Sequence, residues 1–320
     1  MKFIHTSDLH YGAAPDANKP WGRERAQAVK NAFNKIIEAC KTEEADLLLI
    51  AGDLFDSIPD EQEIAEVNEA FASIPKTRVA IIPGRNEKIT HAFPQVTFEW
   101  APNVTYVIND NGPAVYFDEV NNIYMTVEEP EEIIDSDKYS YVALGGRHKP
   151  SALVKGNMAY SGSPEPITSA DTSAHGYYIG KIHPQTRELC SFKFVTLDTV
   201  RYISLVVNVT PETKNEEVVD NIRSEILKRG KENIYRLRIK GMSSPEVEFD
   251  LSTLTTNFRI SDIVDQTEPK YDYLKLYAEH SDDMVGFFIR EMNKSDKTDI
   301  QRKALTYGIN ALLKTADERN

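Results

Sequence analysis

Four segments of the chain start as runs of apolar residues and end abruptly in polar ones. They span residues 3–10, 47–53, 79–87 and 141–148. A short apolar run that ends in Gly and a cluster of Asp, His or Asn is typical of a buried parallel strand. Because ligands of open α/β sheets collect at the carboxyl ends of the strands, the four ends predict one shared site.

Candidate metal ligands stand at these strand ends. Asp8 and His10 follow the first strand, Asp53 follows the second and His148 follows the fourth. Asp8 and His10 are two residues apart, so the alternation of a strand would point both side chains the same way. Carboxylate and imidazole ligands suit Mn, Fe or Zn without choosing among them. The alternative is that loop backbone satisfies these side chains and that no metal is bound.

Helix and strand patterns alternate up to about residue 195, and residues 26–40 have the apolar spacing of a packed helix. A second unit is predicted to begin near residue 200. Its predicted strands are 201–209, 234–240 and 247–251. Its predicted helices are 216–229, which stops at Gly230, and two C-terminal helices at 283–292 and 299–314.

Size and composition set outer bounds. The chain has 320 residues, enough for two domains, and a hydrophobic fraction of 41% that suffices for packed cores. Cys40 and Cys190 match no metal or redox spacing. No signal peptide, membrane-length apolar span or lipidation motif is visible, which predicts a cytoplasmic protein. The net charge of −13 argues against tight, unaided binding to nucleic acid, because non-specific affinity comes from Lys and Arg.

Two blocks of sequence carry a family resemblance. Residues 1–10 read MKFIHTSDLH and residues 52–56 read GDLFD. They resemble the D-x-H and G-D-x-x-D blocks of the calcineurin-like metallophosphoesterases, and residues 160–166 resemble a turn of the SbcD-type DNA repair exonucleases within them. The resemblance implies an α/β fold, a four-layer two-sheet sandwich with a small α+β capping domain and C-terminal helices. The implied division is 1–197 for the phosphoesterase domain, 198–268 for the capping domain and 269–320 for the helical segment.

Two other blocks depart from the family pattern. Residues 84–87 read GRNE where the family has G-N-H-D, so Arg85 replaces the metal-binding Asn and Asn86 replaces the catalytic His. Residues 145–148 read GGRH where the family has G-H-x-H, so the first His is lost and His148 remains. A further family His between these blocks has no evident counterpart.

The losses fall on one metal of the family's pair. The resemblance implies that the first metal binds Asp8, His10, Asp53 and His148, which are all present. Of the second metal's ligands only the bridging Asp53 remains, and Gly146 stands where one His is lost. We therefore expect at most one divalent ion, Mn before others, with no ion as the alternative.

Arg85 and Arg147 lie in the two altered blocks. A guanidinium cannot be deprotonated to become a ligand, but it could hold the carboxylates and attract a phosphate through forked hydrogen bonds. We predict that one of these arginines lies within salt-bridge reach of Asp53. The alternative is that both point to solvent. Asp56 and Glu87 are predicted to be structural or to support the ligands from behind.

Other basic residues are candidates for DNA contact. Arg23 and Arg25 lie after His10 at the predicted start of a helix. Three more share one face of the strand 234–240 by period two: Arg236, Arg238 and Lys240. A solvated surface explains these residues equally well. The resemblance also implies an SbcC-type coiled-coil ATPase as partner of the C-terminal helices, although these helices could pack on the chain itself. A homodimer is left open.

Two functions follow from this pattern. The first is an SbcD-like DNA repair exonuclease homologue with a degraded dinuclear site, weak or inactive as a nuclease, that acts as a scaffold binding DNA or an ATPase partner. The second is an active Mn-dependent DNA exonuclease, a phosphodiesterase that uses one metal plus arginine. No membrane partner is expected from either.

Overall fold

The computed structural model describes residues 1–84, 93–109, 112–197, 199–292 and 298–317. The chain forms two compact units, Met1–Tyr202 and Ile203–Asn320. The described residues do not include Arg85 and Asn86, which the sequence predicts to replace a metal ligand and the catalytic His. They also do not include Glu87, predicted to be structural or to support the ligands. The predicted division into three parts stays a prediction.

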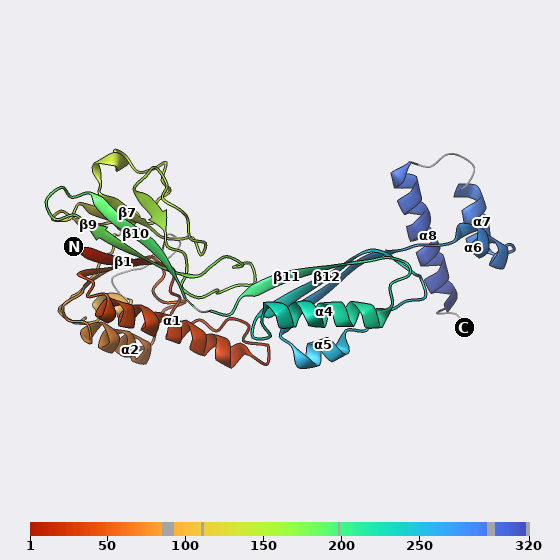
Figure 1. Ribbon diagram of the computed structural model, residues 1–320, viewed down its shortest axis with the longest axis horizontal. Coiled ribbons are helices and arrows are strands. Elements are labelled where there is room, and N and C mark those ends of the chain that lie inside the picture. Colours follow the sequence, from red (N-terminus) through yellow and green to blue (C-terminus); the bar gives the residue numbers. More distant parts are fainter. Residues whose placement is uncertain (85–92, 110–111, 198, 293–297, 318–320) are drawn as a thin grey trace. The chain divides into compact units, whose positions relative to one another are not determined.

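The first unit is built, in its described residues, on two sheets (Figure 1). The larger sheet has the strand order β10-β9-β1-β2-β3-β4. β1, β2, β3 and β4 run parallel to one another, whereas β9 is antiparallel to both β1 and β10. Its strands are β1 (Lys2–Thr6), β2 (Leu47–Ala51), β3 (Arg78–Ile82), β4 (Val104–Tyr106), β9 (Gly176–Ile182) and β10 (Leu189–Thr196).

The central strands are buried on both faces because each is a short apolar run. β2 reads LLLIA, and all its residues are buried. One face of the sheet packs on helices α1 (Gly22–Thr42) and α2 (Glu61–Ala72), which contribute Phe33 and Phe71 to that core. The apolar face predicted for residues 26–40 is therefore confirmed. A one-turn helix, α3 (Pro94–Thr97), precedes β4.

The smaller sheet packs on the other face and has the order β5-β6-β7-β8. Its strands are β5 (Tyr116–Asp118), β6 (Ile123–Thr126), β7 (Tyr141–Leu144) and β8 (Met158–Tyr160). Its outer side is covered by irregular chain that includes Ile133 and the 3-10 turn η1 (Ser136–Lys138). The predicted α/β sandwich of two sheets is confirmed. Its fourth layer, outside the smaller sheet, consists of irregular segments instead of long helices.

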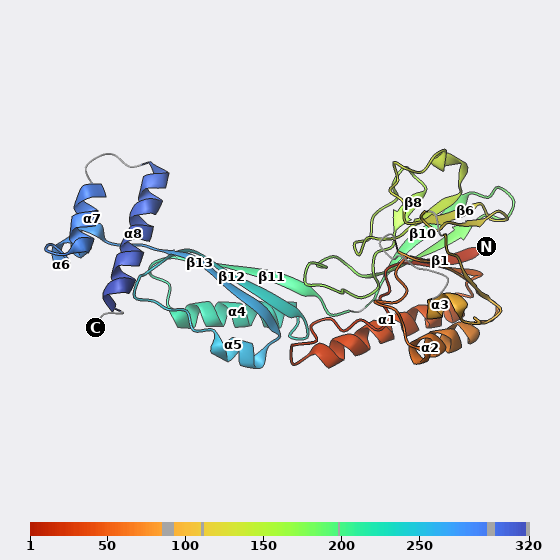
Figure 2. The same cartoon turned by 180° about the vertical axis from the view of Figure 1, so that it is seen from behind.

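The second unit contains a sheet of order β11-β12-β13, with β12 and β13 parallel. Its strands are β11 (Tyr202–Val209), β12 (Ile234–Ser243) and β13 (Ile260–Pro269). Helices α4 (Asn215–Arg229) and α5 (Ser252–Asn257) pack on one face (Figure 2). α4 is followed by Gly230, whose φ of +106° suits a glycine. The predicted helix and first two strands are confirmed.

The strand predicted at 247–251 is wrong. These residues alternate apolar and polar side chains, but the position beside β12 is taken by β13. Leu251 instead precedes α5 and is buried in the core of this unit together with Leu254. A loop that buries single apolar side chains in the core shows the same alternation over so short a run. The pattern therefore did not distinguish a strand from a loop.

The C-terminal part forms three helices in the described residues, α6 (Tyr273–Glu279), α7 (Met284–Met292) and α8 (Asp299–Asp317). They share a small core of their own, in which Val285 and Ile289 of α7 meet Leu305 and Ile309 of α8. The two predicted C-terminal helices are confirmed. Across the described ranges of the chain, no helix combines the length and the apolar character needed to cross a membrane.

Candidate metal centre

Two loops that follow neighbouring parallel strands bind one another along their length. The backbone N–H of Asp8, after β1, donates to the carbonyl of Gly52, after β2, at 3.1 Å. The backbone N–H of His10 donates to the carbonyl of Asp53 at 2.9 Å. These bonds fix three candidate ligand positions relative to the sheet before any side chain is considered.

Three candidate residues have left-handed backbone, with φ of 49° at Asp8, 46° at His10 and 41° at Asp53. Such a conformation costs a residue other than glycine about 1–3 kcal/mol and persists where surrounding bonds impose it. β1 already ends at Thr6. The side chains of Asp8 and His10 therefore converge through left-handed turns. The expectation that strand alternation aligns them is wrong.

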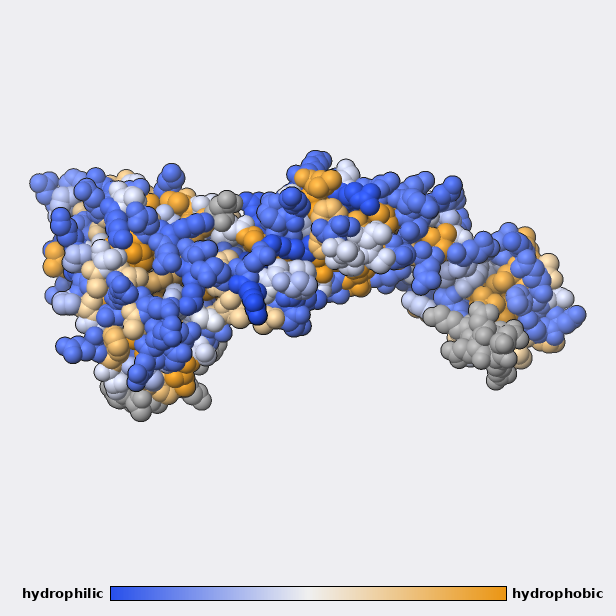
Figure 3. All heavy atoms as spheres, turned by 90° about the horizontal axis from the view of Figure 1, so that it is seen from below, coloured by the Kyte–Doolittle hydropathy of each residue, from blue (hydrophilic) through white to orange (hydrophobic). Residues whose placement is uncertain are grey.

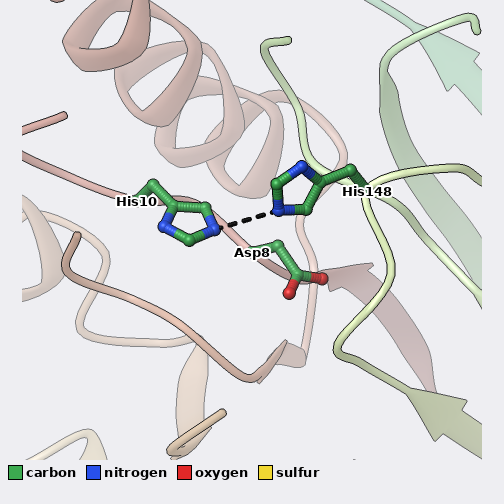
Figure 4. A group of neighbouring side chains, drawn as sticks. All are labelled: Asp8, His10 and His148. Carbon is green, nitrogen blue, oxygen red and sulfur yellow. Dashed lines mark hydrogen bonds between the residues drawn. The ribbon is translucent and has the colours of Figure 1, made fainter. Parts of the chain in front are cut away.

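Asp8, His10 and His148 form the centre of the site (Figure 4). One ligand atom from each lies within 4.8 Å of the other two. The Nε2 atoms of the two imidazoles face each other at 3.2 Å. Asp8 is 1% exposed, whereas the histidines are only partly buried. A buried carboxylate and two converging imidazoles at the carboxyl ends of strands form a group that could hold a metal ion.

Carboxylates lie behind both imidazoles. His148 Nδ1 is hydrogen-bonded to Asp171 Oδ2 at 3.0 Å. His10 Nδ1 lies 3.2 Å from Asp56 Oδ1, without the alignment of a hydrogen bond. Asp56 thus occupies the supporting position that the sequence predicted for it. Carboxylates in this position orient metal-binding imidazoles and make them stronger ligands.

This donor set fits a divalent cation. A carboxylate can only accept hydrogen bonds, so Asp171 favours a proton on Nδ1 of His148. The Nε2 lone pair of His148 then faces His10 Nε2 across 3.2 Å, and a proton or a cation can lie between the two nitrogen atoms. Nitrogen and carboxylate ligands are those that Zn, Mn and Fe accept.

Burial and neighbouring charges shift the pKa values of several groups in the site. Burial raises the pKa of Asp8, and the negative charge of Asp53 adds to that effect. The hydrogen bond to Asp171 raises the pKa of His148 despite its partial burial. Although burial opposes it, hydrogen bonds from His148 and from the Thr168 backbone hold the pKa of Asp171 well below its usual range. Negative charge thus surrounds the imidazoles and favours a cation.

Asp53 stands beside this triad and is not part of it. Its carboxylate packs against Gly84, where a Cβ atom would lie 2.0 Å from Asp53 Oδ1. Glycine at position 84 is therefore required for the carboxylate to occupy this place. The structure brings together three of the four predicted ligands, and metal binding by Asp53 stays a prediction.

Arg147 does not pair with Asp53, contrary to the expectation for this residue. Its guanidinium binds Glu129 at 2.5 Å and lies 4.5 Å from the centre of the Tyr160 ring. The side chain is 55% exposed. The carboxylate of Glu129 and the aromatic ring of Tyr160 supply a partner that the sequence argument did not consider, and they draw the cation away from Asp53.

Gly146, at the position of a family His, has a different role here. Its backbone N–H donates to Asp8 Oδ2 at 3.2 Å. Its φ is +84°, and a Cβ atom at this position would meet no other atom within 4 Å. The space in which a second-metal ligand would begin is open on this side.

Arg25 is wrong as a DNA-binding candidate, because it is completely buried. Its guanidinium pairs with Glu165 and also donates to the Pro166 carbonyl. Arg23 is exposed. The other three candidates stand on the β12 face opposite α4 and α5, as period two predicts: Arg236, Arg238 and Lys240. Arg236 pairs with Asp262 of β13 at 3.0 Å.

Two contributors to the site, Asp171 and the backbone N–H of Gly146, lie outside what the strand-end blocks predict. Asp171 is separated from the strand-end blocks, and its only local signal is the Thr168–Asp171 spacing of a polar turn. That spacing predicts a turn and says nothing about His148. A backbone donor has no sequence signature at all.

The triad lies within a region of the chain that is similar to a known protein family. The family model described as calcineurin-like phosphoesterase matches residues 1–181. A curated relative, the DNA double-strand break repair protein Mre11 of Archaeoglobus fulgidus, is 35% identical over 91 residues. That alignment covers 28% of this chain and 20% of the relative's own length.

Proposed function

The chain belongs to the calcineurin-like phosphoesterase family, and from this premise we propose that it is an SbcD-like DNA repair exonuclease homologue with one metal site left. In this proposal it has weak or no nuclease activity and acts as a scaffold for DNA or an ATPase partner. The single observation that carries the proposal is the triad of Asp8, His10 and His148, assembled beside an open position at Gly146.

The residues would divide the work as follows. Asp8, His10 and His148 would hold one divalent ion, most suitably Mn²⁺, with Asp53 beside it. Such an ion, when bound, polarises a phosphoryl oxygen and lowers the pKa of a bound water. Gly146 would keep the Asp8 carboxylate oriented through its backbone N–H. Among the described residues, this triad is the group of His, Cys, Asp and Glu side chains whose ligand atoms lie close enough to hold a metal ion.

The loss of a second ion and of the catalytic His should reduce hydrolysis severely. Two metals clamp the attacking and leaving oxygens of a phosphoryl displacement, and general acid catalysis alone contributes about 10²- to 10⁴-fold in rate. In this proposal both contributions are missing. The same family membership supports the second candidate, an active Mn-dependent exonuclease with one metal plus arginine.

One experiment separates the two. Protein purified in manganese is analysed for metal by mass spectrometry, and the same sample is assayed on double-stranded DNA and on bis-p-nitrophenyl phosphate. We expect up to one Mn per chain and very weak or absent hydrolysis. Turnover at ordinary nuclease rates that Asp53→Asn abolishes would contradict the proposal and favour the active enzyme.

Two surfaces support a scaffold role. Arg238 and Lys240 on the open face of β12 are proposed to touch DNA phosphates, and binding by this route would weaken steeply with salt. Large apolar side chains are exposed on the C-terminal helices, where hydrophobic patches interrupt the polar surface (Figure 3): Leu274, Met284, Phe287, Ile300 and Tyr307. We propose this surface for an SbcC-type ATPase; a homodimer and a cytoplasmic location stay predictions.

A further inference from the structure

Asp171 is held by the loop between β8 and β9, independently of the metal site. Its Oδ2 atom accepts the backbone N–H groups of Ile167 at 3.0 Å and Thr168 at 2.8 Å, and the Thr168 hydroxyl at 3.2 Å. The same oxygen lies 3.0 Å from His148 Nδ1. Only 11% of the side chain is exposed. The loop therefore fixes where this carboxylate lies before His148 contacts it.

The loop is itself anchored to the first unit. His175 Nδ1 lies 2.8 Å from the Ser163 carbonyl, and its Nε2 lies 3.3 Å from the Asp171 carbonyl. Glu165, in the same loop, pairs with the buried Arg25 of α1. These contacts tie the backbone on both sides of Asp171 to the sheet and the helix that position the triad.

Asp56 behind His10 differs from Asp171 in exposure and in its geometry toward the imidazole. Its side chain is 43% exposed, and its oxygen is not aligned for a hydrogen bond with the imidazole. His148 lies two residues after Gly146, whose φ is +84°. Of the two imidazoles, His148 is the one whose Nδ1 is hydrogen-bonded to a carboxylate.

We propose that Asp171 is a positioning residue for the metal centre: it fixes the proton of His148 on Nδ1 and turns the Nε2 lone pair toward Asp8 and His10. This inference rests on the proposed metal site. Removing the negative charge of Asp171 should weaken metal binding about 10- to 100-fold, the usual effect of losing such a partner.

The test is calorimetric titration of the metal-free full chain with manganese chloride. Asp171→Asn should bind about 10- to 100-fold more weakly than wild type, and Asp56→Asn should lose less. Asp137→Asn, on the exposed turn η1, is the matched control and should bind as wild type. Wild-type affinity in Asp171→Asn would overturn this inference alone, whereas no Mn²⁺ binding by wild type would overturn the proposed metal site with it.

A second measurement tests the proposal in the wild-type protein, so it does not depend on whether Asp171→Asn folds. The seven histidines are labelled with ¹⁵N in the metal-free wild type, and His148→Gln assigns the signal of His148. At about pH 9, where a free imidazole is neutral, the proposal expects the proton of His148 on Nδ1. A proton on Nε2 would overturn it. A purely structural role for Asp171 would lower thermal stability without fixing this tautomer.

Discussion

Replacing Asp8 by Asn should have opposite effects on the metal-free and metal-loaded protein. The carboxyl is 1% exposed and lies near the charge of Asp53, and burial raises its pKa. Its ionised form is therefore disfavoured in the metal-free fold. Asn keeps an oxygen that can accept the N–H of Gly146 but carries no charge. We expect Asp8→Asn to unfold at a higher temperature than wild type without metal.

The same substitution should abolish stabilisation by Mn²⁺. At a concentration 100 times the dissociation constant, a ligand that binds only the folded state adds about 2.7 kcal/mol. Unfolding of the Met1–Tyr202 unit carries an entropy of about 0.4 kcal/mol per kelvin, from about 2.1 cal/mol/K per residue. Mn²⁺ should therefore raise the midpoint temperature of unfolding by about 6 °C in wild type. In Asp8→Asn it should raise that temperature by almost nothing.

The assay is differential scanning calorimetry of both proteins, first after chelation and then with manganese in excess. Asp137→Asn serves as the control and should keep the wild-type gain. The reasoning is refuted if Asp8→Asn shows the same gain as wild type. It is also refuted if the variant unfolds earlier than wild type without metal, because the Asp8 charge would then stabilise the empty site.

Three further outcomes can be checked. Arg25→Met leaves the buried Glu165 carboxylate unpaired and should cost about 3–5 kcal/mol in urea unfolding, whereas replacing both by Met should cost less. Burial lowers the pKa of His5 to about 3, so below pH 6.5 the folded state binds fewer protons than the unfolded state. The free energy of unfolding should therefore fall by about 4 kcal/mol between pH 6.5 and pH 3. In His5→Gln, the free energy of unfolding should depend less on pH over this range when it is measured by acid titration. Arg147→Ala removes a half-exposed ion pair with Glu129, so it should lower the free energy of unfolding by less than about 1 kcal/mol. It should leave the Mn²⁺ affinity unchanged in calorimetry. A tenfold change in that affinity would show that Arg147 acts at the metal site.

The sequence was sufficient for β1, β2, β3 and β7 of the first unit and for the three residues of the triad. Buried parallel strands such as β2 are continuous apolar runs, and polar residues at their carboxyl ends gather because the strands are parallel. The left-handed turns at Asp8 and His10 could not be predicted, because hydrogen bonds between two loops distant in sequence impose them.

The errors have the same physical origin. Arg25 looked like a surface cation because its partner Glu165 is far away along the chain. Arg147 was one of two candidates for a place beside Asp53, and its partners Glu129 and Tyr160 reach it only in the folded state. Local sequence determines which side chains are available near a strand end. Tertiary partners determine where each charge finally lies.

The most direct test of the central claim is a crystal of the protein grown with manganese and measured for anomalous scattering near the Mn absorption edge. The account predicts one peak, within ligand distance of Asp8, His10 and His148, and no second ion beside Asp53. Two neighbouring peaks at full occupancy would contradict it, as would a single peak away from the triad.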